Sequence, residues 1–398
     1  MTQRGRLALV LGATTYLAAW AFGSKVLYPV AIGLPVAVLL AWLWTAVANR
    51  PLQITRTLPS GERLEGDDVE VEVRLASERR LLPARWTLRE RIGKLGEHST
   101  PLSADGHARY VLEGLARGRY EFEGSTAVIE DPFGLERVEQ PLDAPGALLV
   151  YPRLVELDRL FSEGGTRSHD GRQLLLRRPS GFDLHSVREY EHGDSLRKVH
   201  WRSTARRAQL MVKELEDSPR DEAAIVLDAD PDAVVGESFD VQVRVAGSLL
   251  LAQARRGRRA VLFVNGAHKT VQRVHSYETD WPQAYDLLAA AEADGHAPAA
   301  ALLGDEASSV ARALELTVVT ASLSPLLVER LLRRTLGQQR AALVYVDPAS
   351  FGPNGAHPGP QPALLRLQAG GVPVAVIRRG DDLASKLGGT ALRKAADG

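Results

Sequence analysis

Three aspartates alternate along one short stretch of the chain: Asp228, Asp230 and Asp232. They follow the apolar run AAIVL, which predicts a buried strand that ends at Asp228. Carboxylate oxygens are the ligands that hard cations prefer, so the three residues are a candidate cation site. Without a cation the carboxylates would repel one another, and Pro231 restricts the loop. The alternative is an acidic strand end that faces solvent, with Asp228 capping the next helix.

A second stretch, residues 164–213, combines positive charge with an aromatic side chain. It holds eleven Arg or Lys and five Asp or Glu residues, a local excess of six positive charges. One interpretation is a docking surface for an acidic partner, for phosphate or for anionic lipid, with Trp201 as its anchor. The other is an internal network of ion pairs, for which Arg side chains are well suited. The candidate residues are Arg188, Glu189, Tyr190, Asp194, Arg197, Trp201, Arg206 and Lys213.

Other patterns that could support chemistry are incomplete. The chain has no Cys, which excludes disulfides, thiolate metal sites and a Cys nucleophile. Residues 195–198 fit S-x-x-K, but the S-D-N and K-T-G motifs that should accompany it are absent. We therefore expect no catalytic residue, and no cofactor beyond the candidate cation. With 49 basic and 49 acidic residues the chain is neutral, so we expect no nucleic-acid partner.

Two uncharged apolar stretches predict a pair of membrane-spanning helices near the N-terminus. Residues 7–23 and 26–48 each approach the roughly 20 residues that cross a bilayer core, with a tight turn between them. Arg4, Arg6, Arg50 and Arg56 flank the terminal side, whereas Lys25 alone lies at the tip. This bias predicts that both termini and the main domains lie in the cytoplasm, and the expected location is the inner (plasma) membrane. A cleaved signal peptide and a buried soluble hairpin are the alternatives.

From residue 51 to 152 apolar and charged residues alternate, as in VEVEVRL. Several short strands of this kind, about ten residues apart, predict a β-sandwich. Within it the segment D-P-F-G-L, residues 131–135, predicts a tight turn. We expect Gly134 to have positive φ, and Phe133 and Leu135 to anchor the turn in the core.

After residue 220, buried apolar runs alternate with helical segments. This order predicts an α/β domain with a mostly parallel, doubly wound sheet, in which ligands lie beyond the carboxyl ends of the strands. The fold class is therefore multidomain. Its predicted parts are a transmembrane helical hairpin (1–50), a β-sandwich (51–152), a basic linking segment (153–220) and the α/β domain (221–398).

The middle of the chain holds a series of short motifs. They are R-G-R-Y at 117–120, D-P-F-G-L at 131–135, V-Y-P at 150–152, and Arg188, Glu189, Tyr190, Gly193, Asp194, Arg197, Trp201, Ala205, Arg206, Leu210, Val212 and Lys213. Together these motifs resemble the bacterial domain of unknown function 58 family. His200 departs from the pattern, because family members usually have an Asp just before the Trp.

The resemblance implies a von Willebrand factor A-like α/β domain. Intact members of that fold hold Mg²⁺ with the motif D-x-S-x-S. Here Asp228 matches the Asp, while Asp230 and Asp232 replace the two Ser residues. The resemblance also implies a partner, an AAA+ ATPase of the MoxR type.

The expected function is a non-catalytic, membrane-anchored adaptor or scaffold. It would work with such an ATPase in the assembly or maturation of a client protein. Two alternatives remain: a metal-dependent hydrolase that uses Asp228, Asp230 and Asp232, and a structural protein of the cell envelope.

Overall fold

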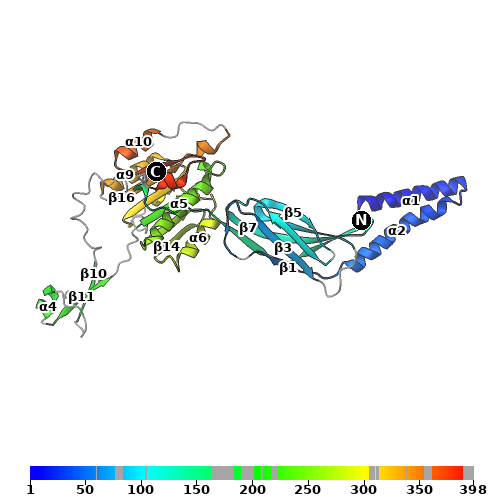
Figure 1. Ribbon diagram of the computed structural model, residues 1–398, viewed down its shortest axis with the longest axis horizontal. Coiled ribbons are helices and arrows are strands. Elements are labelled where there is room, and N and C mark those ends of the chain that lie inside the picture. Colours follow the sequence, from blue (N-terminus) through cyan, green and yellow to red (C-terminus); the bar gives the residue numbers. More distant parts are fainter. Residues whose placement is uncertain are drawn as a thin grey trace, which may run out of the picture. The chain divides into compact units, whose positions relative to one another are not determined.

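The computed structural model divides the chain into two units, Met1–Arg153 and Leu154–Gly398 (Figure 1). Each has its own sheets and its own apolar core. The residues described are 1–59, 61–76, 84–103, 105–162, 183–189, 201–207, 209–216, 223–303, 310, 313–337, 339–353 and 361–388.

The first unit begins with two long antiparallel helices, α1 (Gln3–Phe22) and α2 (Leu27–Ala48) (Figure 1). Both are long and apolar enough to cross a membrane. Many of their apolar side chains point outward, including Leu7, Leu17 and Leu39, each about 61% exposed. A hairpin buried in a soluble core would hide such side chains, whereas lipid contact favours their exposure. The two helices therefore support insertion in a membrane.

Two β-sheets follow in the same unit. Their strands pair antiparallel except β2 with β9. The smaller sheet has the order β1 (Gln53–Thr57), β3 (Val69–Ala76), β6 (His107–Leu112). The larger has the order β2 (Arg63–Leu64), β9 (Gly146–Tyr151), β7 (Gly118–Glu130), β4 (Arg85–Ile92), β5 (Gly96–Pro101), with β8 (Arg137–Leu142) also paired to β7.

The core of this unit lies between the two sheets. In β3 every second residue is buried, as the alternation of the sequence predicts. Its apolar residues Val69, Val71 and Val73 share one cluster with Leu88 of β4 and Phe122 of β7. Side chains from both sheets thus close a single core.

A buried polar group links the two sheets inside this core. The guanidinium of Arg56, on β1, contacts the carboxylate of Glu90, on β4, with 2.5 Å between Nη2 and Oε1. The hydroxyls of Tyr110 and Ser125 donate to the same carboxylate at 2.6 and 2.9 Å. Arg56 also stacks over the ring of Phe122. Arg56 is therefore a core residue. The sequence placed it among the charges that flank the membrane helices, and the structure corrects this.

The turn at residues 131–135 has the predicted backbone but a different side-chain arrangement. Gly134 has φ of 70°, as expected, and the buried Asp131 accepts from the amides of Phe133 and Glu136 at 2.8 and 2.6 Å. The prediction that Phe133 anchors the turn in the core is wrong, because its side chain is 77% exposed. The buried Asp131 fixes the turn from within, so the aromatic ring is free to face outward.

The second unit contains a six-stranded mixed sheet. Five strands are parallel, and β14 pairs antiparallel with β13 at one edge. The order is β14 (Lys269–Val274), β13 (Ala260–Asn265), β12 (Ala223–Asp228), β15 (Glu315–Thr320), β16 (Arg340–Val346), β17 (Val374–Ile377).

Helices cover both faces of this sheet. On one face Val226, Phe263 and Val318 pack in one cluster with Leu327 of α9 (Pro325–Leu336) and Leu367 of α10 (Gln361–Ala369). Alternation along the strands turns the intervening buried residues to the other face. That face is covered by α5 (Ser238–Arg255). The other helices of this region are α6 (Trp281–Ala290), α7 (Ala299–Leu302) and α11 (Leu383–Leu387).

Candidate functional site

The carboxyl ends of three neighbouring strands place polar side chains together in the second unit. Asp228 ends β12, Asn265 ends β13 and Thr320 ends β15. The Asn265 amide donates to Oδ1 of Asp228 at 3.1 Å, and the Thr320 hydroxyl lies 2.8 Å from Oδ2. All three side chains are buried. The edge predicted to hold a ligand is therefore a closed hydrogen-bonded cluster around one carboxylate.

A loop between α6 and α7 closes this edge. The Gly295 amide donates to the carbonyl of Ala229 at 2.8 Å, and the Asn265 side chain donates to the carbonyl of Ala297 at 2.6 Å. A Cβ at Gly295 would overlap the carbonyl oxygens of Ala229 and Asn265. Glycine is thus needed for the loop to lie directly over the strand ends. This packing is the physical reason why Asp228 is only 3% exposed.

Burial raises the pKa of Asp228 above its ordinary value. Hydrogen bonds from Thr320, Asn265 and the Ala299 backbone act in the opposite direction, and the charge of Asp230 adds to the increase. The burial effect is the largest of these. The carboxylate is therefore well provided with donors and still costly to ionise.

The three aspartates do not converge on one point. Asp230 turns to cap the short 3-10 helix η4 (Pro231–Ala233), and its carboxylate accepts from the Asp232 amide at 3.0 Å. Asp232 is exposed, whereas Asp228 is buried. Among the described residues, no group of three or more His, Asp or Glu side chains is arranged to hold a metal ion. The three-carboxylate Mg²⁺ site is thus not assembled. Asp230 caps the turn, Asp232 is exposed, and Asp228 is buried.

The alternative, a solvent-facing strand end with Asp228 capping the next helix, is also not what the structure contains, because Asp228 is buried. The capping residue is Asp230, and Asp228 faces the strand ends. Farther along the same edge, the buried Asp347 follows β16 and lies 3.5 Å from Nε of Arg378. Its amide partner is Ala349, at 3.2 Å, in the first turn of a 3-10 helix. Asp347 therefore has a capping role.

The basic stretch contains a β-hairpin and a short helix. Strands β10 (Asp183–Glu189) and β11 (Met211–Glu216) pair antiparallel, and α4 (Trp201–Arg207) lies between them in the sequence. The register places Arg188 opposite Val212, and Val187 opposite Lys213. The backbones of three candidate residues, Arg188, Glu189 and Lys213, thus lie in one two-stranded ladder. Tyr190, Asp194 and Arg197 lie outside the described residues.

Trp201 is the most exposed large aromatic side chain described in this stretch. It begins α4 and is 69% exposed, and Arg206 on the same helix is also exposed. The helix is held by Thr204, whose hydroxyl accepts from the Met211 amide at 3.0 Å, while Met211 itself is buried. Trp201 and Arg206 therefore face solvent on an element that is attached to β11 through other residues.

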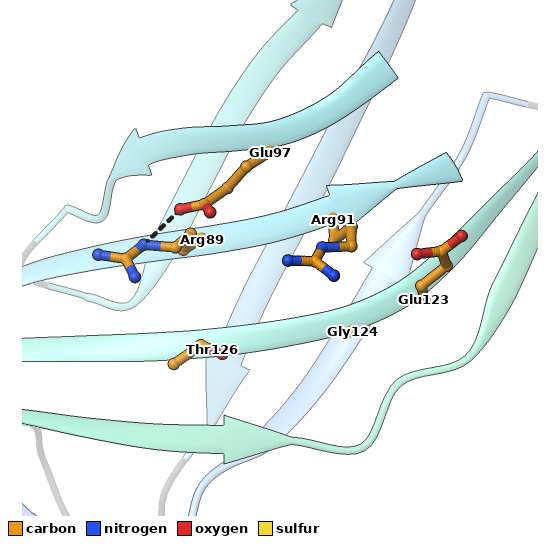
Figure 2. Close-up of a pocket in the computed structure, with 6 residues that line it drawn as sticks. All are labelled: Arg89, Arg91, Glu97, Glu123, Gly124 and Thr126. Carbon is orange, nitrogen blue, oxygen red and sulfur yellow. Dashed lines mark ion pairs between the residues drawn. The ribbon is translucent and has the colours of Figure 1, made fainter. Parts of the chain in front are cut away.

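A shallow hollow of about 400 Å³ lies on the outer face of the larger sheet in the first unit (Figure 2). Arg89 on β4 pairs with Glu97 on β5, with 2.7 Å between Nε and Oε1. Basic and acidic side chains alternate around the hollow, so it presents no concentrated charge. Sequence reasoning did not single it out. The lining residues are Arg89, Arg91, Glu97, Glu123, Gly124 and Thr126.

Comparison with known proteins identifies the segment that contains the Asp228 cluster and most of the basic stretch. Residues 186–339 match the family model described as protein of unknown function DUF58, which confirms the family resemblance. This range includes Trp201, Asp228, Asn265 and Thr320. The chain is also 25% identical over 276 residues to the uncharacterized protein YeaD of Bacillus subtilis (strain 168), covering 66% of this chain and 68% of that protein. The chain thus has a central segment that matches DUF58 and two apolar helices near its N-terminus.

Solved structures show only weak similarity. The PKD domain of human SorCS2 is 17% identical, with a TM-score of 0.19, and the match covers 27% of this chain and 76% of that one. The bacterial hydrophobin BslA is 11% identical, with a TM-score of 0.17, over 26% of this chain and all of that one. Cwp6 from Clostridium difficile is 9% identical, also with a TM-score of 0.17, over 83% of this chain and 38% of that one.

Asn265 and Thr320 were missed by sequence reasoning. Both end apolar runs, AVLFVN and LTVVT, that were recognised as strands. A polar residue at the last position of several parallel strands is the signal that would have found them, because those ends meet at one edge of the sheet.

Proposed function

We propose that the protein is a non-catalytic, membrane-anchored adaptor whose DUF58 segment binds an AAA+ ATPase of the MoxR type. The observation that carries this proposal is that Trp201 and Arg206 are both exposed on the same short helix, α4. Trp and Arg are the residues most enriched at energetic centres of protein interfaces. A Trp side chain also offers a large, amphipathic contact area that a partner surface can bury. The ATPase is the partner that family resemblance implies.

The α/β unit supports a von Willebrand factor A-like assignment. Asp228 ends a central parallel strand, helices cover both faces, and an antiparallel strand lies at one edge. Domains of this architecture use their strand ends and nearby loops for binding. In the adaptor, the closed cluster around Asp228 would hold the shape of this edge rather than perform a reaction.

The helical hairpin supports attachment to the inner membrane. Arg4, Arg6 and Arg50 remain on the terminal side of the two helices after Arg56 is removed from the count, and Lys25 lies at the tip. This bias favours both termini and both units in the cytoplasm, where an ATPase has access to them. The hydrolase alternative is not carried further, because no three acidic or His side chains among the described residues are grouped to hold a metal ion.

The decisive experiment is affinity purification of the tagged full-length protein from solubilised native membranes, followed by mass spectrometry. We expect a MoxR-type ATPase with the wild type, and its loss with Trp201→Ala and with Arg206→Glu. Leu336→Ala is the matched control, since Leu336 is an exposed apolar residue at the end of α9 within the same DUF58 segment. If Trp201→Ala recovers as much ATPase as the wild type, Trp201 is not part of a docking surface for it. Its absence from the wild-type sample, with and without a non-hydrolysable nucleotide, would contradict the adaptor function.

A further inference from the structure

Phe133 lies at an unusual place for a large aromatic side chain. It occupies the outer corner of a turn between β7 and β8 and is 77% exposed. The buried Asp131 holds the turn through the amides of Phe133 and Glu136, and Gly134 supplies the positive φ. The ring is thus presented outward by a hydrogen-bonded turn.

The same turn is hydrogen-bonded to the start of α1. The Thr2 amide donates to the carbonyl of Leu135 at 3.1 Å, and the Thr2 hydroxyl donates to the carbonyl of Gly134 at 2.7 Å. Gly5 packs so closely on the Leu135 carbonyl that any side chain at residue 5 would overlap it. The turn therefore has a fixed position relative to the first turn of a helix that is apolar enough to cross a membrane.

This position corresponds to the depth of the lipid headgroups. The uncharged stretch of α1 begins at Leu7, and a helix rises about 1.5 Å per residue, so Thr2 lies about 7 to 8 Å outside the hydrocarbon core. Each headgroup layer is about 5 to 8 Å thick. Arg4 and Arg6, both exposed, lie in this layer, where anionic headgroups favour positive charge. Trp and Tyr rings are enriched at this depth, and Phe is among the residues that interfacial helices bury at the headgroup boundary.

We propose that Phe133 inserts into the interfacial layer of the bilayer, so that the 131–135 turn is a membrane contact of the first unit separate from its two helices. The occupant of this apolar surface is the lipid headgroup region and no second protein. The inference rests on the proposed membrane anchoring. It adds that a β-turn of the folded domain touches lipid.

The absence of Cys from the chain allows a direct test with single labels. Nitroxide labels are placed at Phe133→Cys, Leu95→Cys and Leu40→Cys in the full-length protein, in nanodiscs of phosphatidylethanolamine and phosphatidylglycerol. Accessibility to oxygen, which concentrates in lipid, is compared with accessibility to a water-soluble nickel chelate. Leu40 is an exposed apolar residue of α2 and reports membrane insertion.

Leu95 is the matched control for Phe133. It is a half-exposed apolar residue in the 3-10 helix η1 (Gly93–Leu95), which follows the end of β4. The register pairs Arg85 at the start of β4 with Glu130 beside the turn, and Ile92 with Phe122. Seven residues of strand, about 23 Å, therefore separate Leu95 from the turn.

We expect the labels at residues 40 and 133 to favour oxygen, and the label at 95 to favour the nickel chelate. An aqueous profile at 133 equal to that at 95, with a lipid profile at 40, would overturn the inference and leave the anchoring intact. An aqueous profile at 40 would overturn both. Since labelling removes the ring, a second measurement uses Phe133→Trp and Leu95→Trp. Brominated lipid should produce a loss of fluorescence from the added Trp at 133 and none at 95, and equal quenching would contradict the inference.

Discussion

The hydroxyl of Thr320 lies 2.8 Å from the carboxylate of Asp228, so that the ends of β15 and β12 are joined by their side chains as well as by the backbone ladder. The same hydroxyl accepts from the Ser322 amide at 2.8 Å. The carboxylate is thus tied to the chain that leaves β15. Because the group is buried, its protonation and its donors both affect the stability of the second unit.

The first prediction concerns the pH dependence of stability. Burial raises the pKa of Asp228 in the folded protein, so the folded state holds this proton more tightly than the unfolded state. The stabilisation that this proton gives the folded state is complete below the pKa that Asp228 has in the unfolded chain. It is lost as the pH rises through the pKa of Asp228 in the folded protein. We expect Asp228→Asn, which stays neutral, to gain stability relative to the wild type as the pH rises from 4 to 8. Thermal unfolding of the detergent-solubilised protein measures this, with the exposed Asp232→Asn as control. A pH-independent difference would contradict it.

The second prediction concerns the donor at residue 320. Thr320→Val keeps the shape of the side chain and removes the hydroxyl, so the buried carboxylate loses one hydrogen bond. The expected cost is about 2 kcal/mol, as for hydrogen bonds to charged groups. Thr320→Ser should recover most of it. Chemical denaturation checks the values, and in the Asp228→Asn background the cost of Thr320→Val should fall, because the charge is gone. An unchanged cost in that background would show that Thr320 acts independently of Asp228.

The third prediction concerns the polar link between the two sheets of the first unit. Glu90→Ala leaves the guanidinium of Arg56 buried without its carboxylate, which should cost about 3 to 5 kcal/mol. Glu72→Ala is the control, since Glu72 also pairs with an arginine, Arg109, but both are half exposed or more. We expect about 0 to 1 kcal/mol there. Equal losses of stability for the two substitutions would mean that the buried pair contributes no more than the exposed one.

The fourth prediction separates binding from stability in the basic stretch. Trp201 is exposed, so Trp201→Ala should change the free energy of unfolding by about 0.5 kcal/mol or less. Met211 is buried beside the same helix, and Met211→Ala should cost about 2 to 5 kcal/mol. Denaturation curves followed by circular dichroism report both. A large loss of stability with Trp201→Ala would favour the internal-network interpretation of the stretch.

Sequence patterns predicted the helices and strands better than they predicted which polar and aromatic side chains are buried. The uncharged runs identified α1 and α2, alternation identified β3, and the apolar run before Asp228 identified β12. The burial of Asp228 was not predictable, because it depends on a loop around Gly295 that is distant in the sequence. Phe133 was assigned to the core because apolar residues in a turn usually pack inward. Only the hydrogen bonds of Asp131 show that the turn is held without it.

Arg56 shows the same limit for charges. Four arginines near the apolar runs were counted as membrane-flanking charges, and a count along the chain cannot tell a solvated arginine from a buried one. In the structure Arg56 pairs with Glu90 in the core. Asn265 and Thr320 were within recognised strands, but a single polar residue at a strand end has meaning only when the neighbouring strands are known.

The first unit is joined to its helical hairpin at two places. One is the hydrogen-bonded contact of Thr2 with the 131–135 turn, and the other is the end of α2, where Ala48 packs with Trp86 and Ile129 of the larger sheet. A domain held by a single flexible tether can swivel freely, whereas two attachments restrict rotation about either one. A pulling force on the sheets of this unit would therefore be transmitted to both helices. With the helices in a bilayer, the force would tilt them.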